Sequence, residues 1–189
     1  MTEPNTLNSI YTIGYGNRAI GDFIALIKCY GIDYVADVRS APFSAFNEDF
    51  SKIKLERRLK ENGVGYLFIG RQLGGKPDDM KYFTNEKIDY AKLSRAPFYR
   101  DGISRLATAL DKKYRVALMC SELKPEQCHR SKLISETLVQ NGIDVRHIDE
   151  LGELKSQSEV MRRLTGGQQG LFGHTFGSVK SYRKNKRKL

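Results

Sequence analysis

One short segment in the second half of the chain concentrates side chains that could do chemistry. Residues 119–130 read MCSELKPEQCHR and hold two cysteines, a histidine, an arginine and acidic side chains. Pro125 suits the first turn of a helix, and the apolar residues that follow, from Leu133 to Leu138, give this helix a stripe that faces the sheet. A helix N-terminus lowers the pKa of a cysteine and attracts anions. The segment therefore predicts a thiol nucleophile, a metal site or an anion pocket.

The cysteines and the histidine admit competing interpretations. Cys120, Cys128 and His129 are three potential zinc ligands. Structural zinc sites usually have paired ligands such as C-x₂-C, and adjacent residues rarely point at one ion, so we expect no metal and no cofactor. Cys128 fits both a nucleophile and a small packing residue. His129 fits both a catalytic role and a helix-capping role.

Arg130 lies where the dipole of the predicted helix disfavours a cation, by roughly 0.3–1 kcal/mol. A negative group should offset this cost. Glu122, Asp37 or a phosphate held at the helix N-terminus could supply it. We therefore predict that Arg130 is tied to one of the two carboxylates.

The elements that position these residues follow a repeated pattern. Three segments show an amphipathic stretch, then Gly31, Gly63 or Gly142, then an apolar run. Glycine closes a helix cheaply in the left-handed conformation, so each segment reads as a helix leading into a strand. Helices are expected near residues 20–30, 51–62, 102–112 and 125–141. With about five apolar strands, this pattern predicts a single α/β domain whose mostly parallel sheet carries helices on both faces. Residues 71–100 have no clean period and are expected to pass over the crevice.

Ligands bind outside the carboxyl ends of the strands in an open parallel sheet. Ionisable and polar side chains follow several of the predicted strands, and burying them together would be costly without a purpose. We therefore expect them to form one functional crevice. The candidate catalytic residues are Asp37, Glu122, His129 and Cys128, and the candidate substrate- or phosphate-binding residues are Tyr15, Asn17, Arg39, Arg71 and Arg130.

Two further stretches offer weaker signals near the same strands. LGGK, residues 73–76, lacks the spacing of a phosphate-binding loop. Phe43, Phe46 and Phe50 are interleaved with polar residues. These rings suit either a stacking surface for a base or core packing.

Composition bounds the class of protein. The chain has 189 residues, of which 40% are hydrophobic and 29% are charged, as in a globular protein. It has no apolar run of the ~18 residues that a membrane span needs. Its first ten residues do not resemble a signal peptide, and its three cysteines cannot all pair with one another. We therefore expect a cytoplasmic protein without membrane partners.

Positive charge is concentrated at the C-terminus. The formal net charge is +10, and the tail contributes Lys180, Arg183, Lys184, Lys186, Arg187 and Lys188. A run of like charge either stays solvated or lies on a polyanion, driven by counterion release. We expect an α/β domain over residues 1–165 and, over 166–189, a Gly-rich linker with a basic tail that contacts DNA.

The linker contains a candidate docking peptide. Its sequence QQGLF, with Gln168, Leu171 and Phe172, resembles the Q-x-x-L-F peptide by which many bacterial repair and replication proteins bind the sliding clamp. A Gln and two apolar side chains would enter a preformed pocket. The competing interpretation is that Leu171 and Phe172 cover an apolar patch of the domain.

Several motifs together carry a family resemblance. They are TIGYGN at 12–17, DVRSAPFS at 37–44, GVGYLFIGRQLGG at 63–75 and LMCSELKPEQCHR at 118–130. From about Tyr11 to Ile148 the chain resembles the bacterial and archaeal family called domain of unknown function 488. The resemblance implies a compact α/β domain with the DVR and CxE…CHR motifs at one site. Carried over, those motifs are Asp37, Arg39, Cys120, Glu122, Cys128, His129 and Arg130; Tyr15 stands where many relatives have His.

The expected function follows from carboxylates beside anion-binding groups. We expect an enzyme that acts on a nucleotide or nucleic acid, with Glu122 or Asp37 as the acid/base or cation-stabilising carboxylate. N-glycosidic cleavage of a modified or damaged base, in DNA repair or phage defence, is favoured over phosphodiester cleavage, since metal-dependent nucleases usually cluster more acids. The alternative is a non-catalytic module that binds DNA or an anionic ligand. The sequence does not specify an oligomeric state.

Overall fold

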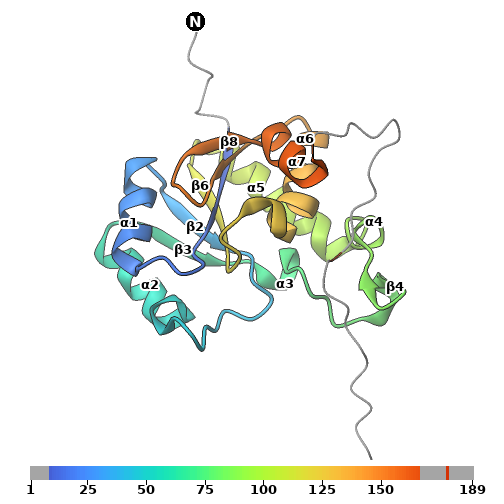
Figure 1. Cartoon of the computed structure of the whole chain (residues 1–189), viewed down its shortest axis with the longest axis horizontal. Coiled ribbons are helices and arrows are strands. Elements are labelled where there is room, and N and C mark those ends of the chain that lie inside the picture. Colours follow the sequence, from blue (N-terminus) through green and yellow to red (C-terminus); the bar gives the residue numbers. More distant parts are fainter. Residues whose placement is uncertain (1–8, 167–177, 179–189) are drawn as a thin grey trace, which may run out of the picture.

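A six-stranded sheet forms the centre of the computed structural model, which describes residues 9–166 and Ser178 (Figure 1). The strand order is β3-β2-β6-β1-β7-β8. The first five of these strands are mutually parallel, and β8 runs antiparallel to β7. The strands are β1 (Ser9–Gly14), β2 (Tyr34–Asp37), β3 (Gly65–Phe68), β6 (Val116–Cys120), β7 (Asp144–Ile148) and β8 (Leu154–Ser156). The predicted α/β fold with a mostly parallel sheet is confirmed; β8 was not predicted.

Helices cover both faces of the sheet, as predicted. On one face lie α1 (Ile20–Cys29) and α2 (Lys52–Glu61). On the other lie α5 (Pro97–Asp111) and α6 (Glu136–Gln140), and α7 (Gln157–Thr165) follows β8 (Figure 1). Among the residues that the structure describes, no helix combines the length and the apolar character that crossing a membrane requires.

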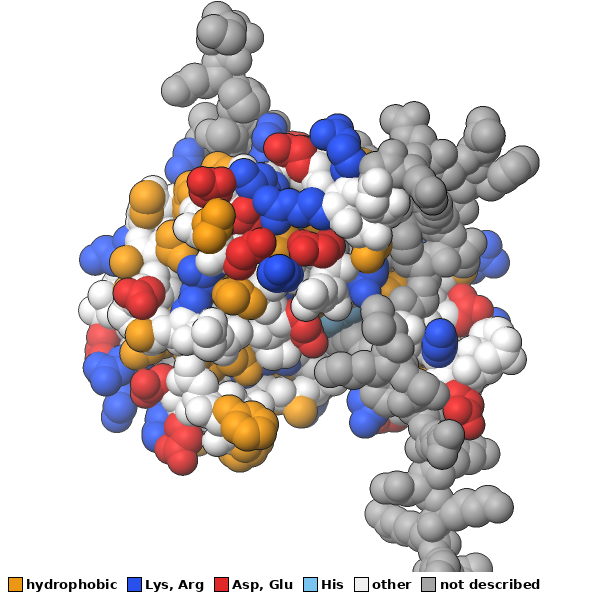
Figure 2. Space-filling view, in the orientation of Figure 1, with side chains coloured by type: hydrophobic (Ala, Val, Ile, Leu, Met, Phe, Trp, Pro, Cys, Tyr) orange, Lys and Arg blue, Asp and Glu red, His pale blue; other side chains and the backbone are white. Residues whose placement is uncertain are grey.

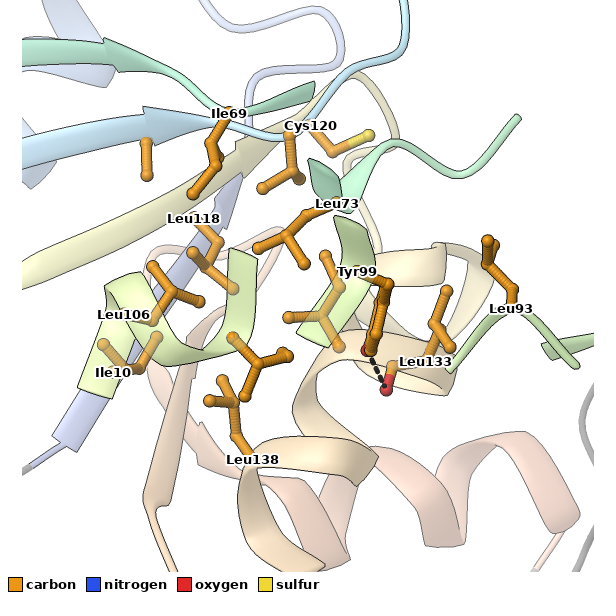
Figure 3. Close-up of a cluster of buried hydrophobic side chains, with 14 of the residues drawn as sticks. Ile10, Ile69, Leu73, Leu93, Tyr99, Leu106, Leu118, Cys120, Leu133 and Leu138 are labelled. Atoms are coloured by element: carbon orange, nitrogen blue, oxygen red, sulfur yellow. Dashed lines mark hydrogen bonds between the residues drawn. The ribbon is translucent and has the colours of Figure 1, made fainter. Parts of the chain in front are cut away.

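Strand residues alternate between two apolar cores, as the two-residue period of a strand requires. Tyr11 and Ile13 of β1 point into the core beneath α1 and α2, whereas Ile10 points into the opposite core. Figure 3 shows this second core, where Leu118 of β6 meets Leu106 of α5. Burying a side chain of this size contributes roughly 1.5–3 kcal/mol, so both faces must be covered for the sheet to be stable.

Three glycines end the helices where the sequence predicts. Gly31, Gly63 and Gly142 have φ angles of 60°, 75° and 77°. They follow α1, α2 and α6 by two residues. This left-handed conformation strains any residue with a Cβ, so glycine at these positions sets where each helix ends.

The predicted helix over residues 125–141 is wrong in its first part. A 3₁₀ turn, η4 (Pro125–Gln127), is followed by an extended Cys128 with φ −112° and ψ 151°. A π-helical segment, η5 (Arg130–Ser135), then leads into α6. The helix therefore begins at His129, and Pro125 belongs to a separate turn. Local π geometry often marks functional positions in helices.

Short elements make up much of residues 71–100, where the sequence shows no clean hydrophobic period. They are α3 (Gly70–Leu73), η3 (Met80–Tyr82), the hairpin β4 (Phe83–Thr84) and β5 (Lys87–Ile88), and α4 (Tyr90–Leu93); a further 3₁₀ turn, η2 (Glu48–Phe50), precedes α2. Ser178 lies against the hairpin. Its N–H donates to the Ile88 carbonyl at 3.1 Å, and its hydroxyl accepts from the Ile88 N–H at 2.9 Å.

Residues 167–177 and 179–189 are outside the described part of the chain. The clamp-binding residues Gln168, Leu171 and Phe172 fall there and stay predictions. The basic residues of the tail also fall there and stay predictions: Lys180, Arg183, Lys184, Lys186, Arg187 and Lys188. The predicted domain boundary near residue 165 is likewise still a prediction.

His147 makes the stability of the fold depend on pH. Its Nδ1 lies 2.7 Å from the Thr12 hydroxyl and its Nε2 lies 2.6 Å from Gln157 Oε1. Burial lowers the pKa of His147 to about 4, from an ordinary value near 6.5. Below about pH 6.5 the unfolded chain therefore binds a proton that the folded protein excludes. We expect the free energy of unfolding to fall by about 2 kcal/mol between pH 7 and pH 5 on account of this residue.

Urea denaturation at several pH values measures this dependence. His147→Asn cannot titrate, so its free energy of unfolding should change less over the same interval, and the difference between the two proteins isolates His147 from the other groups. Identical pH profiles would contradict the prediction.

Candidate functional site

A crevice of about 850 Å³ lies at the carboxyl ends of β1, β2 and β6. Its walls come from residues directly after these strands, from the turn after α3 and from the segment around η4 and η5. The lining residues are Tyr15, Arg39, Ser40, Ala41, Phe43, Gly75, Lys76, Tyr90, Cys120, Ser121, Glu122, Glu126, Gln127, His129, Lys132, Leu164 and Ser178. This is the edge of the sheet at which the sequence predicts a ligand site.

A buried ion pair forms the floor beside β2. Arg39 Nε lies 2.9 Å from Asp37 Oδ1, and its Nη2 lies 2.6 Å from Oδ2. The Tyr66 hydroxyl also donates to Oδ2, at 2.8 Å. Burial opposes the charge on Arg39, but the hydrogen bonds and charge of Asp37 raise its pKa; burial and the same carboxylate raise the pKa of Tyr66. Asp37 is 0% exposed, so it positions Arg39 and has no access to a ligand.

Glu122 is the carboxylate of the CxE motif that reaches the crevice. Its Oε2 lies 3.0 Å from Cys120 Sγ and 3.3 Å from Cys128 Sγ, and accepts from the Ser121 hydroxyl at 3.2 Å. The main chain beneath it is packed against β1. A Cβ on Gly14 would lie 2.0 Å from the Glu122 carbonyl oxygen, so only glycine fits there.

His129 completes the cluster from the start of the helix. Its Nδ1 lies 3.9 Å from Cys120 Sγ and 3.6 Å from Cys128 Sγ. The side chains of the adjacent residues Cys128 and His129 nevertheless converge, since Cys128 Sγ, His129 Nδ1 and Cys120 Sγ lie within 4.8 Å of one another. The extended backbone at Cys128 turns its side chain toward His129.

The pKa values of the two cysteines are shifted in opposite directions. The hydrogen bond with Cys128 and burial raise the pKa of Cys120. Burial also opposes ionisation of Cys128, but the hydrogen bond from Cys120 and the charges of Arg130 and His129 lower its pKa. Burial disfavours the charged form of His129, but the negative charge of Cys128 outweighs this effect and raises the pKa of His129.

Arg130 lies behind the cluster and is fully buried. Its Nη1 donates to the Glu122 carbonyl at 2.5 Å and its Nη2 to the Leu123 carbonyl at 3.1 Å. The predicted tie to Glu122 is present, but not with its carboxylate: within the described residues no carboxylate lies within 4.0 Å of the Arg130 guanidinium. The contact with Glu122 is through its main chain, and Arg130 holds the loop in place instead of facing the crevice.

Cations and aromatic rings line the same crevice as Glu122. Lys132 is 5% exposed and lines the crevice, and burial lowers its pKa. Phe43 is 71% exposed at the rim. Phe50 is instead a core residue that stacks on Tyr15, with ring centroids 4.2 Å apart, so core packing holds for Phe50 and a base-stacking surface at Phe43 stays a prediction. Figure 2 shows basic and acidic side chains interspersed over one face of the molecule, without a uniform basic surface.

The structure separates the predicted site residues into three groups. Tyr15, Arg39, Glu122 and His129 line the crevice, whereas Asp37, Cys128 and Arg130 are buried behind it. Asn17 and Arg71 are exposed and are not among the residues that line it. The buried residues of the short helix that carries Arg71 are Gly70 and Leu73, which leaves Arg71 on its exposed side.

Sequence reasoning missed Lys132, Ser121 and Tyr90. Lys132 follows His129 by three residues, so both lie on one side of the helix; this spacing was the available signal. Tyr90 comes from α4, on the distant hairpin segment, and no local pattern connects it with the strand ends.

Comparisons with known proteins give one match. The family model described as "Domain of unknown function DUF488" matches residues 19–138, which is more than half of the chain. Searches of curated proteins and of solved structures gave no match. The matched residues include Arg39, Glu122 and His129, so most of the crevice lies within the family's domain. The chain therefore belongs to the domain of unknown function 488 family.

Proposed function

We propose that the protein is a hydrolase that acts on a nucleotide or nucleic acid in this crevice. The observation that carries the proposal is the placement of the Glu122 carboxylate among Arg39, Lys76, Lys132 and aromatic rings. Cations suit phosphate groups, and rings such as Phe43 suit stacking on a base. Hydrolysis of an N-glycosidic bond is the favoured reaction, because a carboxylate can stabilise the cation that develops as the base leaves.

The burial pattern divides the roles. Glu122 is the acid/base or cation-stabilising group, because Asp37 is buried under Arg39 and accepts hydrogen bonds from four donor atoms. Arg39 is held rigidly by that carboxylate, so it can bind an anion without first being ordered. Lys132 is a second phosphate partner, since no carboxylate of the described residues lies within 4.0 Å of its ammonium group.

Turnover of oligonucleotides carrying modified or damaged bases tests the proposal. We expect Glu122→Gln to lower kcat by about 100-fold or more while DNA binding persists, because proton transfer by a positioned side chain contributes roughly 10²–10⁴. Lys132→Ala should instead weaken binding and reduce its dependence on salt by about one counterion. Glu61→Gln, on the exposed end of α2, is the matched control. DNA binding without turnover of any substrate, unchanged in Glu122→Gln, would favour a binding module instead.

A further inference from the structure

Four potential metal ligands meet at the inner end of the crevice. Cys120 Sγ, Cys128 Sγ and His129 Nδ1 lie within 4.8 Å of one another. Glu122 Oε2 lies 3.0 and 3.3 Å from the two sulfurs, and Nδ1 lies 3.9 and 3.6 Å from them. A tetrahedral zinc ion with ordinary bond lengths needs edges of about 3.6 Å between sulfur and nitrogen or oxygen. We propose that these residues form a binding site for Zn²⁺, with Cys120, Cys128 and His129 as ligands and Glu122 in the fourth position.

The orientation of His129 supports this assignment. Its Nε2 lies 3.2 Å from the Val38 carbonyl oxygen. A carbonyl only accepts, so Nε2 carries a hydrogen and Nδ1 is the nitrogen that faces the two sulfurs, where it can offer its lone pair to an ion once it is deprotonated. Histidine ligands of metals are usually oriented by such a bond from the other ring nitrogen. Gly75 packs against the ring, where a Cβ would lie 2.6 Å from His129 Cγ, so the imidazole has little freedom to rotate.

The charge of the surroundings supports it too. Two thiolates, one carboxylate and Zn²⁺ carry a net charge of −1, because the ligands lose their protons on binding. Arg130 is fully buried, and its guanidinium donates to the carbonyls of Glu122 and Leu123. A buried cation without an anionic partner is costly. The occupied site would supply that partner. Separately, the backbone N–H of Arg130 donates to Cys128 Sγ at 3.4 Å, as amides commonly do to thiolate ligands of a metal.

The ion would be reachable from the crevice. Cys120, Glu122 and His129 line the crevice, whereas Cys128 is 1% exposed behind them. Replacement of the Glu122 carboxylate by water would leave three protein ligands and one open position, which is the pattern of catalytic zinc sites. Release of Glu122 from the ion would also free its carboxylate for the acid/base role proposed above.

Metal content of the full-length protein tests the site. The protein is purified under reducing conditions, loaded with Zn²⁺ or Co²⁺, and freed of excess ion. We expect about one ion per chain, thiolate-to-cobalt charge-transfer absorption in the Co²⁺ form, and protection of Cys120 and Cys128 from alkylation. Cys128→Ser and His129→Gln should lose the ion, and Glu122→Gln should bind it more weakly. Cys29→Ser, which removes the exposed cysteine, is the matched control and should keep the ion.

Outcomes that overturn the proposal are separate from those that overturn the hydrolase. A protein without stoichiometric ion, an ion retained by Cys128→Ser and His129→Gln combined, or a Cys120–Cys128 disulfide in the reduced preparation would each do so. Zn²⁺ should also raise the Tm of the wild type and leave that of folded Cys128→Ser unchanged. None of these readouts depends on turnover, so an inactive protein that binds zinc would leave the site standing.

Discussion

Replacing Asp37 with alanine is expected to lower the free energy of unfolding by about 3–5 kcal/mol, because the change strands a buried guanidinium. Asp37 is 0% exposed and Arg39 is 4% exposed, so water compensates little. The same substitution orphans the Tyr66 hydroxyl, which donates to Asp37 at 2.8 Å. Urea denaturation of the variant at pH 7 measures the loss.

A double substitution separates the stranded charge from the other losses. In Asp37→Ala with Arg39→Met the unpaired cation is gone, so the double variant should be more stable than Asp37→Ala alone by at least about 1 kcal/mol. Glu48→Gln breaks an exposed pair with Lys54 and is the matched control; its unfolding midpoint should hardly move. Equal losses in the single and double variants would mean that Arg39 reaches water when Asp37 is removed.

Replacing Arg130 with methionine is expected to cost about 3–5 kcal/mol, since each carbonyl that loses its buried donor costs roughly 1–3 kcal/mol and a cavity adds to this. The two carbonyls belong to Glu122 and Leu123, which form the loop that carries the crevice carboxylate. Methionine keeps the apolar length of the side chain, so the loss reports mainly on the hydrogen bonds. Thermal and urea denaturation measure it.

A conservative substitution provides a second test of whether Arg130 holds the loop. Arg130→Lys keeps the charge but cannot span both carbonyls in the same way, so its stability should fall between those of the wild type and Arg130→Met. Arg105→Met, on the exposed side of α5, is the control for loss of an arginine. If Arg130→Met and Arg105→Met unfold at the same urea concentration, the guanidinium does not hold the loop.

The sequence alone determined the architecture and the edge of the sheet at which the site lies. Apolar runs alternating with amphipathic stretches specify parallel strands covered on both faces, since each face must be buried. Gly31, Gly63 and Gly142 predict where helices end, and the positive φ angles of these residues confirm it. Ligand sites of such sheets lie at the carboxyl ends of the strands, so Arg39 and Glu122 could be placed together from the sequence.

Only the tertiary structure decided what each side chain does at that edge. Asp37 and Glu122 are both carboxylates after strands, but Asp37 is occupied by Arg39 and Tyr66 whereas Glu122 faces the crevice. The backbone at Cys128 is extended between two helical segments, which a helical phase drawn through residues 125–141 cannot predict. The convergence of Cys120, Cys128 and His129 depends on that break and on packing against Val38 and Gly75. Period and propensity report local conformation, whereas burial and side-chain direction at the site follow from contacts between segments distant in the chain.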